Sequence, residues 1–474
     1  MAEQRDSDMR LLFEPRSVAV IGASRNPAKF GHVQLRNLTE LRFQGQVYPV
    51  NPNADQVLGL KAYRSVREVP APIDLAVITI PAPKVPEAVE DCAEKGVKVA
   101  VITSSGFGEV GGEGTERERL IVQIAKKVGM RIVGPNTTGI VNTANNFTTS
   151  FISLPNLKRG PVAFIAQTGL FAAASLWHML TAERFGVSKV AGLGNKADVN
   201  DQDVLQYLAS DPETRVVAIY MEGVKDGRGF VKVAREVSKR KPIILLKGAR
   251  TPEGARAAAS HTASIAVRDD VFEAACRSAG ILRARSFEEM MDLAKVFAYQ
   301  PPARGCRLAV VTFTGAGGVM ASDRAAQEGL ELTELSPETI KRLQAKMPSW
   351  ARAGNPVDAE PLFETLGPDA SLRFALDAIA KDANVDVVAL FLVALHQFQF
   401  DLTRTVAEIK ENLAAANKPV AVHITGAREL VTEATTLLEE NQIPVYPSIE
   451  RAVSSLAAAY RYASRCHASR ELSV

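Results

Sequence analysis

The sequence predicts an α/β protein of three consecutive domains, each a Rossmann-like or flavodoxin-like doubly wound parallel sheet. One pattern occurs three times: a basic or proline-containing lead-in, a short apolar run, a loop of small residues and then a helical segment. The apolar runs are 17–21, 162–165 and 307–312, about 145 residues apart. That spacing is typical of one α/β domain. Of the 474 residues, 46% are hydrophobic and 23% charged, so several sizeable cores can form.

Apolar runs alternate with amphipathic segments inside each repeat. In the first repeat the runs are 47–50, 75–80, 97–102 and 131–133, and the amphipathic segments include 85–95 and 116–128. Such alternation is typical of a doubly wound sheet. Further runs occur at 187–190, 216–221, 242–246, 385–392 and 420–424. Because proline, glycine and basic residues cluster near 156–160 and 300–305, we predict domains at 1–155, 156–300 and 305–474.

Composition and charge argue against several classes of protein. The net charge is +3 and no dense basic run interleaved with aromatic residues occurs, so a nucleic acid partner is not expected. The longest apolar run, Val385–Leu395, is about half of what a bilayer span needs, so no membrane association is expected. Residues 1–6 are polar, unlike a signal peptide. Four scattered cysteines without a Cys-x-x-Cys pair predict reduced thiols, no metal site and a cytoplasmic location.

The loop at 22–31 follows the first predicted strand and precedes a helix. Backbone N–H groups at such a helix start bind phosphates, so Gly22 and Ser24 are candidate binding residues for an anionic, nucleotide-like ligand. Arg25 and Lys29 could donate charge-assisted hydrogen bonds to the same phosphates, although a solvated basic surface explains them equally well.

A nicotinamide dinucleotide is not expected at this loop. The G-x-G-x-x-G fingerprint requires glycine where Ser24 and Pro27 stand. It also requires an acidic residue at the end of the second strand, where the sequence has Asn51. Asn51 is therefore a candidate for binding a different ligand.

Two further candidates, Pro81 and Asn136, follow other strands of the first domain. Pro81 comes directly after the run 75–80, and Asn136 lies in the turn Gly134–Gly139. A third loop, 103–109, follows the run 97–102. Ligands of doubly wound sheets collect at the carboxyl ends of the strands. Ordinary turns are the alternative interpretation.

His261 lies among very small side chains, at 255–266. Slim neighbours let a bulky charged group approach the ring, and the hydroxyls of Ser260, Thr262 and Ser264 could donate to oxyanions. A neutral imidazole is a competent nucleophile that can carry a covalent intermediate. The alternative is a helix-surface or capping histidine.

Several motifs occur in the order found in one known family. They are the loop Gly22–Pro27, the turn Gly134–Asn136, and the segments Ile165–Gly169, Gly192–Asp198, Tyr220–Gly223, Ser260–Thr262 and Gly354–Asp358. With them, nearly the whole chain resembles the alpha subunit of the NDP-forming acyl-CoA synthetases, in the ADP-forming acetyl-CoA synthetase branch of the succinyl-CoA synthetase superfamily. The resemblance implies a CoA-binding domain, a ligase-type domain with a phosphohistidine, and a flavodoxin-like third domain. In the implied reaction acyl-CoA, phosphate and NDP interconvert with a carboxylic acid, CoA and NTP through an acyl phosphate.

The resemblance also assigns roles to single residues. His261 matches the phosphorylated histidine, and Glu222 matches the carboxylate that hydrogen-bonds the imidazole. A phosphohistidine needs such an acceptor at its other ring nitrogen; a surface ion pair is the alternative for Glu222. Gln167, Thr168 and Gly169 match a helix start whose N–H groups and dipole would bind the phosphoryl group. A plain helix start is the alternative for these three.

The nucleotide is expected on a partner. No G-x-x-x-x-G-K-[ST] motif occurs. The family carries its nucleotide on an ATP-grasp domain, so the resemblance implies a separate ATP-grasp beta subunit with the nucleotide and Mg²⁺, and a hetero-oligomer. CoA and a small carboxylic acid are the substrates expected here. A non-catalytic acyl-CoA-binding regulatory protein and a nicotinamide oxidoreductase are the rival functions.

Several positions depart from the family pattern. Ala166 replaces a serine, and Leu170 and Phe171 stand where smaller residues are usual. Ala263 and Val267 replace glycines of the phosphohistidine loop, and Thr137 replaces a cysteine after the Gly-Pro-Asn turn. These departures bear on substrate choice, on the freedom of the loop and on the surroundings of the CoA thiol.

Overall fold

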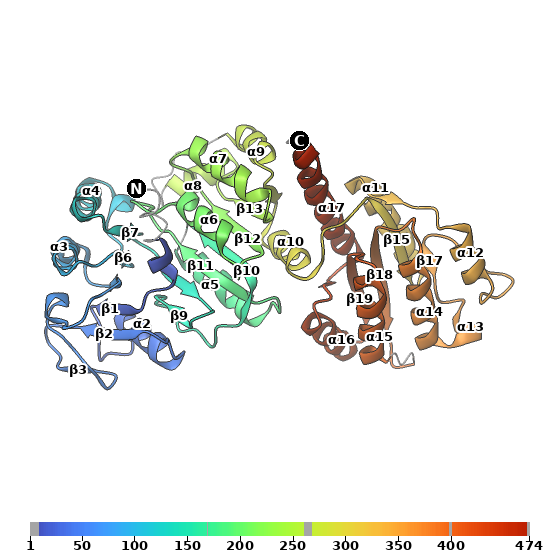
Figure 1. The fold of residues 1–474 in the computed structure, drawn as a ribbon, viewed down its shortest axis with the longest axis horizontal. Helices are drawn as coiled ribbons and strands as arrows, with labels where there is room; N and C mark the ends of the chain where they lie inside the picture. The colour runs from blue at the N-terminus through green and yellow to red at the C-terminus, as the bar shows by residue number, and fades with distance from the viewer. Residues whose placement is uncertain (1–8, 168, 260–267, 398–400, 472–474) are drawn as a thin grey trace. The chain divides into compact units, whose positions relative to one another are not determined.

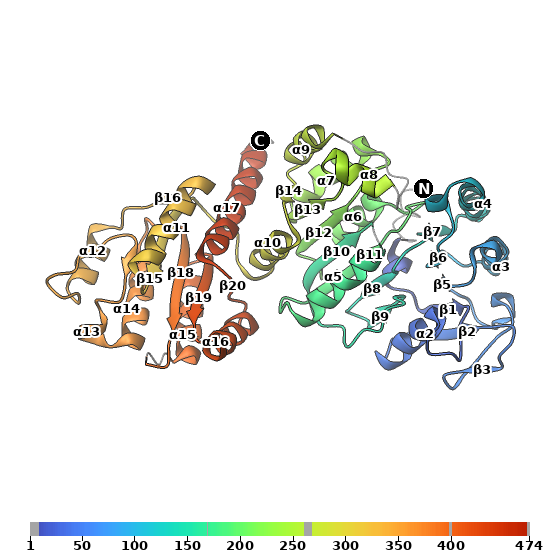
Figure 2. The same ribbon diagram turned by 180° about the vertical axis from the view of Figure 1, so that it is seen from behind.

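The computed structural model describes residues 9–167, 169–259, 268–397 and 401–471, and it confirms the predicted α/β fold class (Figure 1). The chain forms two compact units, Met1–Ser286 and Phe287–Val474. Two large sheets belong to the first unit and one to the second. Figure 2 shows the same ribbon from behind. No helix in the described part of the chain is long and apolar enough to cross a bilayer.

The first sheet is entirely parallel, with the order β2-β1-β5-β6-β7. Its strands are β1 (Ser17–Ile21), β2 (Gln46–Val50), β5 (Leu75–Ile78), β6 (Val99–Ile102) and β7 (Arg131–Val133). Its helices are α2 (Phe30–Glu40), α3 (Val85–Lys95) and α4 (Gly112–Val128), and β3 (Gln56–Val57) and β4 (Leu60–Lys61) form a small hairpin. The helices α3 and α4 end at Gly96 and Gly129, whose φ values of +80° and +72° suit glycine and stop a helix.

Helices cover both faces of this sheet, because the side chains of a strand alternate between faces. Val18 and Val20 of β1 belong to the same core cluster as Leu35 and Leu38 of α2. Ala19 and Ile21, the intervening residues, belong to a second cluster with residues of α3 and α4. All five residues of β1 are buried, as expected of a strand in a parallel sheet.

The second sheet has the order β14-β13-β12-β10-β11-β8-β9. Its parallel strands are β10 (Arg159–Ala166), β11 (Val187–Gly192), β12 (Val216–Met221), β13 (Ile243–Lys247) and β14 (Leu282–Ala284). The short strands β8 (Ile140–Asn142) and β9 (Phe147–Thr148) extend it as antiparallel strands. The helices are α5 (Gly169–Thr181), α6 (Asp201–Ser210), α7 (Gly227–Ser238), α8 (Pro252–Ala259) and α9 (Asp269–Ser278). Residues 140–148 therefore pair with the second sheet.

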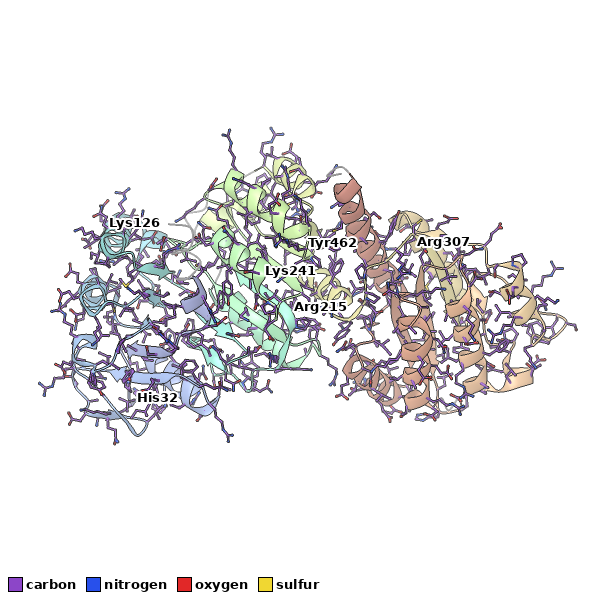
Figure 3. All side chains as sticks on the ribbon, in the orientation of Figure 1. His32, Lys126, Arg215, Lys241, Arg307 and Tyr462 are labelled. Atoms are coloured by element: carbon purple, nitrogen blue, oxygen red, sulfur yellow. The ribbon has the colours of Figure 1, made fainter. Side chains whose placement is uncertain are left out.

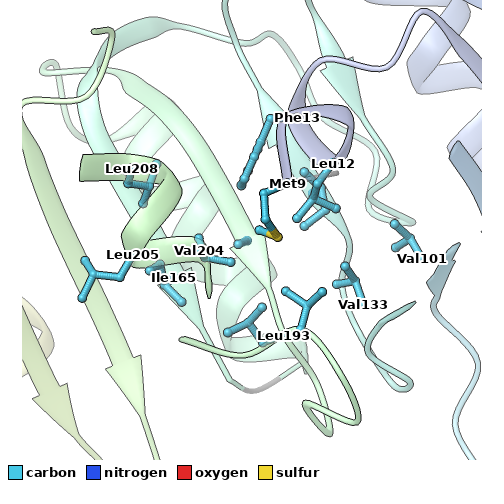
Figure 4. Packing of buried hydrophobic residues seen from close by; sticks show 14 of the residues in the cluster. Met9, Leu12, Phe13, Val101, Val133, Ile165, Leu193, Val204, Leu205 and Leu208 are labelled. Atoms are coloured by element: carbon cyan, nitrogen blue, oxygen red, sulfur yellow. The ribbon is translucent and has the colours of Figure 1, made fainter. Parts of the chain in front are cut away.

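One hydrophobic core joins the first two sheets. The cluster that contains Val18 and Val20 of β1 also contains Ile165 of β10 and Leu205 of α6. Met9, Leu12 and Phe13 pack within this cluster, beside Val101, Val133 and Leu193 (Figure 4). Because this core is continuous, residues 9–286 form one unit.

The second unit contains one sheet with the order β16-β15-β18-β19-β20, in which β17 pairs with β15. Its strands are β15 (Arg307–Thr312), β16 (Glu331–Leu332), β17 (Val357–Asp358), β18 (Val387–Ala394), β19 (Val420–Gly426) and β20 (Val445–Tyr446). Its helices are α10 (Phe287–Tyr299), α11 (Gly315–Glu328), α12 (Pro337–Gln344), α13 (Phe363–Leu366), α14 (Pro368–Lys381), α15 (Leu402–Glu408), α16 (Arg428–Glu440) and α17 (Ile449–Glu471).

Candidate active site

The three sheets share one order of parallel strands. Numbered by their sequence within each repeat, with the two-residue strand β17 left out, the strands lie in the order 2-1-3-4-5, which places the first strand beside the third. In sheets of this kind ligands bind outside the carboxyl ends of the strands, where the strand order reverses. The ends of β1 and β5, and of β10 and β12, are therefore the places where a binding site is expected in the first unit.

A cavity of about 810 Å³ lies at this point of the first sheet. Five of the predicted binding residues line it: Gly22, Ser24, Lys29, Asn51 and Pro81. Its other walls come from Phe30 and Gly31, from Thr79, Ile80 and Ala82 after β5, and from Thr103, Ser104 and Ser105 after β6. The volume is that of a typical small-molecule or cofactor site.

Two glycines let the chain cross closely at the floor of this cavity. Gly22 has a φ of +95°, and a Cβ there would lie 2.6 Å from the Thr79 carbonyl oxygen. A Cβ on Gly31 would lie 2.1 Å from the carbonyl oxygen of Gly22. The start of α2 thus approaches the end of β1 more closely than any side chain allows. Sequence reasoning found Gly22 but missed Gly31, whose signal was a glycine at the second position of the helix.

Polar side chains hold the loop after β1 in shape. Ser24 Oγ accepts a hydrogen bond from the Asn26 N–H at 3.1 Å. Asn51 Nδ2 donates to the Ala23 carbonyl oxygen at 2.7 Å, and Asn51 Oδ1 accepts from the Asn53 N–H at 2.8 Å. The buried His32, labelled in Figure 3, has its Nδ1 2.8 Å from the Ser24 carbonyl oxygen. The Asn51 amide thus ties β2 to the loop, and His32 is a second support that sequence reasoning missed.

The start of α2 is suited to an anion. Its N-cap residue is Lys29, no side chain among the described residues caps its free N–H groups, and its first turn contains no acidic residue. The Lys29 ammonium makes no hydrogen bond or ion pair within the described residues, so it can meet a phosphate. Arg25 does not line the cavity; its Nη2 lies 3.5 Å from the Asn53 carbonyl oxygen.

Asn136 and Thr137 lie at the junction between the first two sheets. The Asn136 N–H donates to the Ser104 carbonyl oxygen at 3.0 Å, so this turn lies beside the cavity without lining it. Thr137 is buried; its hydroxyl donates to the Gly192 carbonyl oxygen at 2.5 Å and accepts from the Gly139 N–H at 2.9 Å. Thr137, the departure from the family's cysteine, is thereby occupied in joining β11 to this turn.

Hydroxyl groups after β5 and β6 form a wall that sequence reasoning did not single out residue by residue. They belong to Thr79, Thr103, Ser104 and Ser105. Ser104 Oγ donates to the Ile80 carbonyl oxygen at 2.5 Å and so joins the two loops. The available signal was the cluster of small hydroxyl residues directly after the run 97–102.

The second sheet brings Gln167 and Glu222 together at its own reversal point. Gln167 follows β10 and Glu222 follows β12, and the register pairs Ala166 with Tyr220. Gln167 Oε1 accepts the N–H groups of Glu222 and Gly223, both at 2.9 Å. The side chain of Gln167 is buried and that of Glu222 is partly exposed.

Two further side chains contact Glu222. The Tyr220 hydroxyl donates to Glu222 Oε1 at 3.3 Å, and Lys247 Nζ donates to the Glu222 carbonyl oxygen at 2.7 Å. Burial, together with the neighbouring Glu222 charge, raises the pKa of Tyr220 to about 12, so the phenol remains a donor at neutral pH. Burial lowers the pKa of Lys247. Neither Tyr220 nor Lys247 was predicted as a site residue.

His261 and Thr168 lie outside the described residues, and Gly169 begins α5. Ala263 also lies outside them. The segment of His261 connects the end of α8 at Ala259 to α9, which begins at Asp269. Within the described residues, no group of three histidine, cysteine, aspartate or glutamate side chains is arranged to hold a metal ion.

The turn after β11 joins the two sheets. Asn195 Nδ2 donates to Glu109 Oε2 at 2.6 Å and to Glu118 Oε2 at 2.8 Å, both from the first sheet's connections. Lys196 Nζ forms a buried ion pair of 2.5 Å with Asp201 and donates to the Gly223 carbonyl oxygen at 3.1 Å. These residues therefore fix the loop that precedes α6 and the turn after Glu222.

Comparison with known proteins identifies the class. Three family models match in succession: a CoA binding domain at residues 16–143, a succinyl-CoA ligase like flavodoxin domain at 159–297, and a Ligase-CoA domain at 308–470. Fold and site thus define a CoA ligase of the succinyl-CoA ligase type.

Individual relatives narrow this class. The chain is 44% identical to acetate–CoA ligase (ADP-forming) II of Archaeoglobus fulgidus, over 97% of this chain and 67% of that protein. It is 41% identical to the alpha subunit of acetate–CoA ligase (ADP-forming) I of Pyrococcus furiosus, over 96% of this chain and 97% of that subunit. The structure of acetyl-coenzyme A synthetase 1 of Ca. Korarchaeum cryptofilum, in complex with phosphate and ADP, matches with a TM-score of 0.90 and 37% identity, covering 98% of this chain and 99% of that one.

The chain belongs to the family of ADP-forming acyl-CoA ligases and corresponds to their alpha subunit. The family, the fold class and the acid–thiol ligase activity predicted from the sequence are confirmed. The CoA-binding match supports CoA as a substrate, and relatives named as alpha subunits indicate a beta-subunit partner.

Proposed function

We propose that this chain activates a carboxylic acid as its CoA thioester by way of a phosphohistidine at His261. In the direction that consumes acyl-CoA, phosphate attacks the thioester carbonyl, which gives an acyl phosphate and releases CoA. The His261 ring nitrogen then attacks the phosphorus, so the P–O bond to the acyl group breaks and the free acid leaves. Transfer of the phosphoryl group from His261 to ADP completes the cycle. Acetate is the first acid to test, because several relatives are named as acetate–CoA ligases.

The position of Glu222 carries this proposal. It lies at the end of β12, beside Gln167 at the end of β10, which is the ligand-binding edge of such a sheet. We propose that the Glu222 carboxylate accepts the N–H of the His261 ring, and that Gln167, Thr168 and Gly169 form the helix start that receives the phosphoryl group.

The cavity of the first sheet would hold CoA. Gly22, Ser24, Asn51 and Pro81 would shape its walls, with Arg25 and Asn136 adjoining. Lys29 and the free N–H groups of α2 would bind phosphate groups of the ligand, since both present positive charge to the cavity. We retain the division into a CoA-binding domain at 1–155, a phosphohistidine domain at 156–300 and a further ligase domain at 305–474.

The partner would be an ATP-grasp beta subunit that holds the nucleotide and Mg²⁺, in a hetero-oligomer. This chain spans 67% of the Archaeoglobus protein but 97% of the Pyrococcus alpha subunit, so the former carries sequence that the latter does not.

The test is to supply the purified chain with acetyl-CoA and ³²P-labelled phosphate, and separately with labelled ATP, Mg²⁺ and a candidate beta subunit. We expect an acid-labile, base-stable phosphoryl group that is absent from His261→Ala and that ADP discharges in the presence of the beta subunit. If CoA or acetyl-CoA binds but no condition labels the chain, the catalytic proposal is wrong and a CoA-binding regulator is the better account.

A further inference from the structure

We infer that Gln167 is a positioning residue for Glu222: its side-chain oxygen fixes the main chain that carries the carboxylate. The inference deepens the proposed function and rests on it, because Glu222 acts there through His261.

The hydrogen bonds of Gln167 are directed at the main chain of the neighbouring strand. Its own N–H donates to the Tyr220 carbonyl oxygen at 3.2 Å, which continues the pairing of β10 with β12 by one residue. Its Oε1 accepts from the N–H groups of Glu222 and Gly223, both at 2.9 Å. An amide oxygen has two lone pairs, and both are used here. The Gln167 oxygen therefore serves the protein and not a ligand.

These two N–H groups need an acceptor that the sheet does not provide. β12 ends at Met221, and the last backbone bond on its other side runs from the Gly248 N–H to the Met221 carbonyl oxygen. The main chain then turns away at Glu222. Without Gln167, two N–H groups next to the carboxylate would lose their partner at a partly buried site, which is costly enough to displace them.

The main chain of Glu222 is consequently held from two sides. Gln167 accepts its N–H, and Lys247 Nζ donates to its carbonyl oxygen at 2.7 Å. Tyr220 contacts the carboxylate itself at 3.3 Å, a longer and weaker bond than those to the main chain. The main-chain clamp thus fixes the backbone position from which the carboxylate extends.

Gln167 also connects the two halves of the proposed phosphohistidine site. It lies two residues before Gly169, with which α5 begins. One residue therefore sets the distance between the helix start that would receive the phosphoryl group and the carboxylate that would hold the ring. A displacement of about 1 Å in such a site costs up to a hundredfold in rate.

The variant Gln167→Met tests the inference, since methionine has a similar length but cannot accept these bonds. With acetyl-CoA and ³²P-labelled phosphate, we expect the initial rate of His261 labelling to fall roughly ten- to a hundredfold. The labelling rate of Glu222→Gln should fall by a comparable factor. The rate of the double variant should be no lower than that of the more impaired single variant, because both changes remove the same function.

A spectroscopic signature separates positioning from general destabilisation. The ³¹P resonance of the phosphohistidine should move to the same position in Gln167→Met and Glu222→Gln. Gln344→Met is the matched control, because Gln344 Oε1 likewise accepts a main-chain N–H, that of Ala353 at 2.9 Å, in the other unit. It should leave both the rate and the resonance unchanged.

The outcomes separate the inference from the proposed function. An unlabelled wild-type chain contradicts the proposed function. The inference alone is overturned if the wild type is labelled and Glu222→Gln is impaired, but Gln167→Met is fully active. It is also overturned if the effects of the two single variants multiply in the double variant. If Gln167→Met does not fold, Gln167→Asn replaces it, since it keeps an amide but shortens the reach by one methylene.

Discussion

Single residues without side chains shape the cavity of the first sheet. Gly22 and Gly31 bring the end of β1 and the start of α2 into contact, and a Cβ on either would overlap backbone atoms. The short distance aims the free N–H groups of α2 at the cavity. The shape of this loop therefore depends on the absence of a Cβ atom at Gly22 and at Gly31.

Gly31→Ala should damage CoA binding. The added Cβ would lie 2.1 Å from the Gly22 carbonyl oxygen, so α2 must move away, and overpacking of this kind costs about 1–3 kcal/mol of folding stability. We expect a lower thermal midpoint and at least a tenfold weaker CoA affinity by titration calorimetry.

Gly227→Ala is the control for this substitution. Gly227 is also at a helix start, in α7, but a Cβ there would meet only a Val224 methyl group at 3.9 Å. Gly227→Ala should keep the CoA affinity of the wild type. If Gly31→Ala binds CoA as tightly as Gly227→Ala, the close approach at Gly31 does not shape the binding site and this account of the cavity is wrong.

The residues predicted from the sequence differ from those missed in the kind of information they need. Gly22, Ser24, Lys29, Asn51 and Pro81 follow predicted strands, and the strand-end rule sufficed to place them at one edge. Gly31 lies four positions beyond the third glycine position of the usual fingerprint, so the template did not reveal it. Lys247 contacts Glu222 only through the pairing of β13 with β12, which spacing along the chain does not display. Tyr220 precedes Glu222 by two residues, so the two-residue repeat of a strand was the available signal for this contact.

At the scale of elements, the helices α2 and α6 differ in whether a side chain caps their first N–H groups. The helix α6 starts with a capping box: Asn200 accepts from the N–H groups of Gln202 and Asp203, and Asp203 accepts from the Asn200 N–H. The helix α2 has no side-chain cap among the described residues. A capped start is saturated, whereas the start of α2 keeps its N–H groups for a ligand.

Lys29→Asp should therefore separate stability from binding. Aspartate at the N-cap can accept the free N–H groups and interacts favourably with the helix dipole, so we expect a gain of about 0.5–1 kcal/mol in unfolding free energy. CoA affinity should fall at least tenfold, because the new carboxylate occupies the place of the phosphate and repels its negative charge. Urea unfolding and CoA titration measure the two effects.

Lys29→Gln is the comparison, as it removes the charge without adding a strong cap. It should leave stability unchanged and weaken CoA binding less than Lys29→Asp. Unchanged affinity in both variants would mean that phosphates do not bind at the start of α2.

At the scale of the whole molecule, one strand order is used three times. The sequence predicted this repetition because buried parallel strands are short apolar runs that recur about every 145 residues. It could not show that the first two sheets share one core, which brings β1, β10 and α6 into one cluster. Nor did it show that residues 140–148 pair with the second sheet, because antiparallel pairing depends on partners distant in sequence.

The charge pairs of the second unit make its stability sensitive to acid. Burial raises the pKa of Asp386, but its hydrogen bonds and its ion pair with Arg307, labelled in Figure 3, lower the pKa by a larger amount. The net pKa of Asp386 is therefore below the ordinary value. Asp377, Asp382 and Glu328 are shifted in the same direction. The folded unit therefore binds protons less readily than the unfolded chain, and its stability falls as pH decreases.

Asp386→Asn should lower the unfolding free energy of this unit by about 2 kcal/mol at pH 7, because Arg307 loses its charged partner. A depressed carboxyl pKa contributes stability that is present above the unfolded pKa of about 3.9 and is lost as pH falls through the folded pKa. The difference between wild type and variant should thus shrink between about pH 5 and pH 3. Glu116→Gln is the control, since its pair with Arg119 is largely exposed and contributes little. Urea unfolding at several pH values measures the difference, and a gap that widens on acidification would show that Asp386 does not stabilise the unit as a carboxylate.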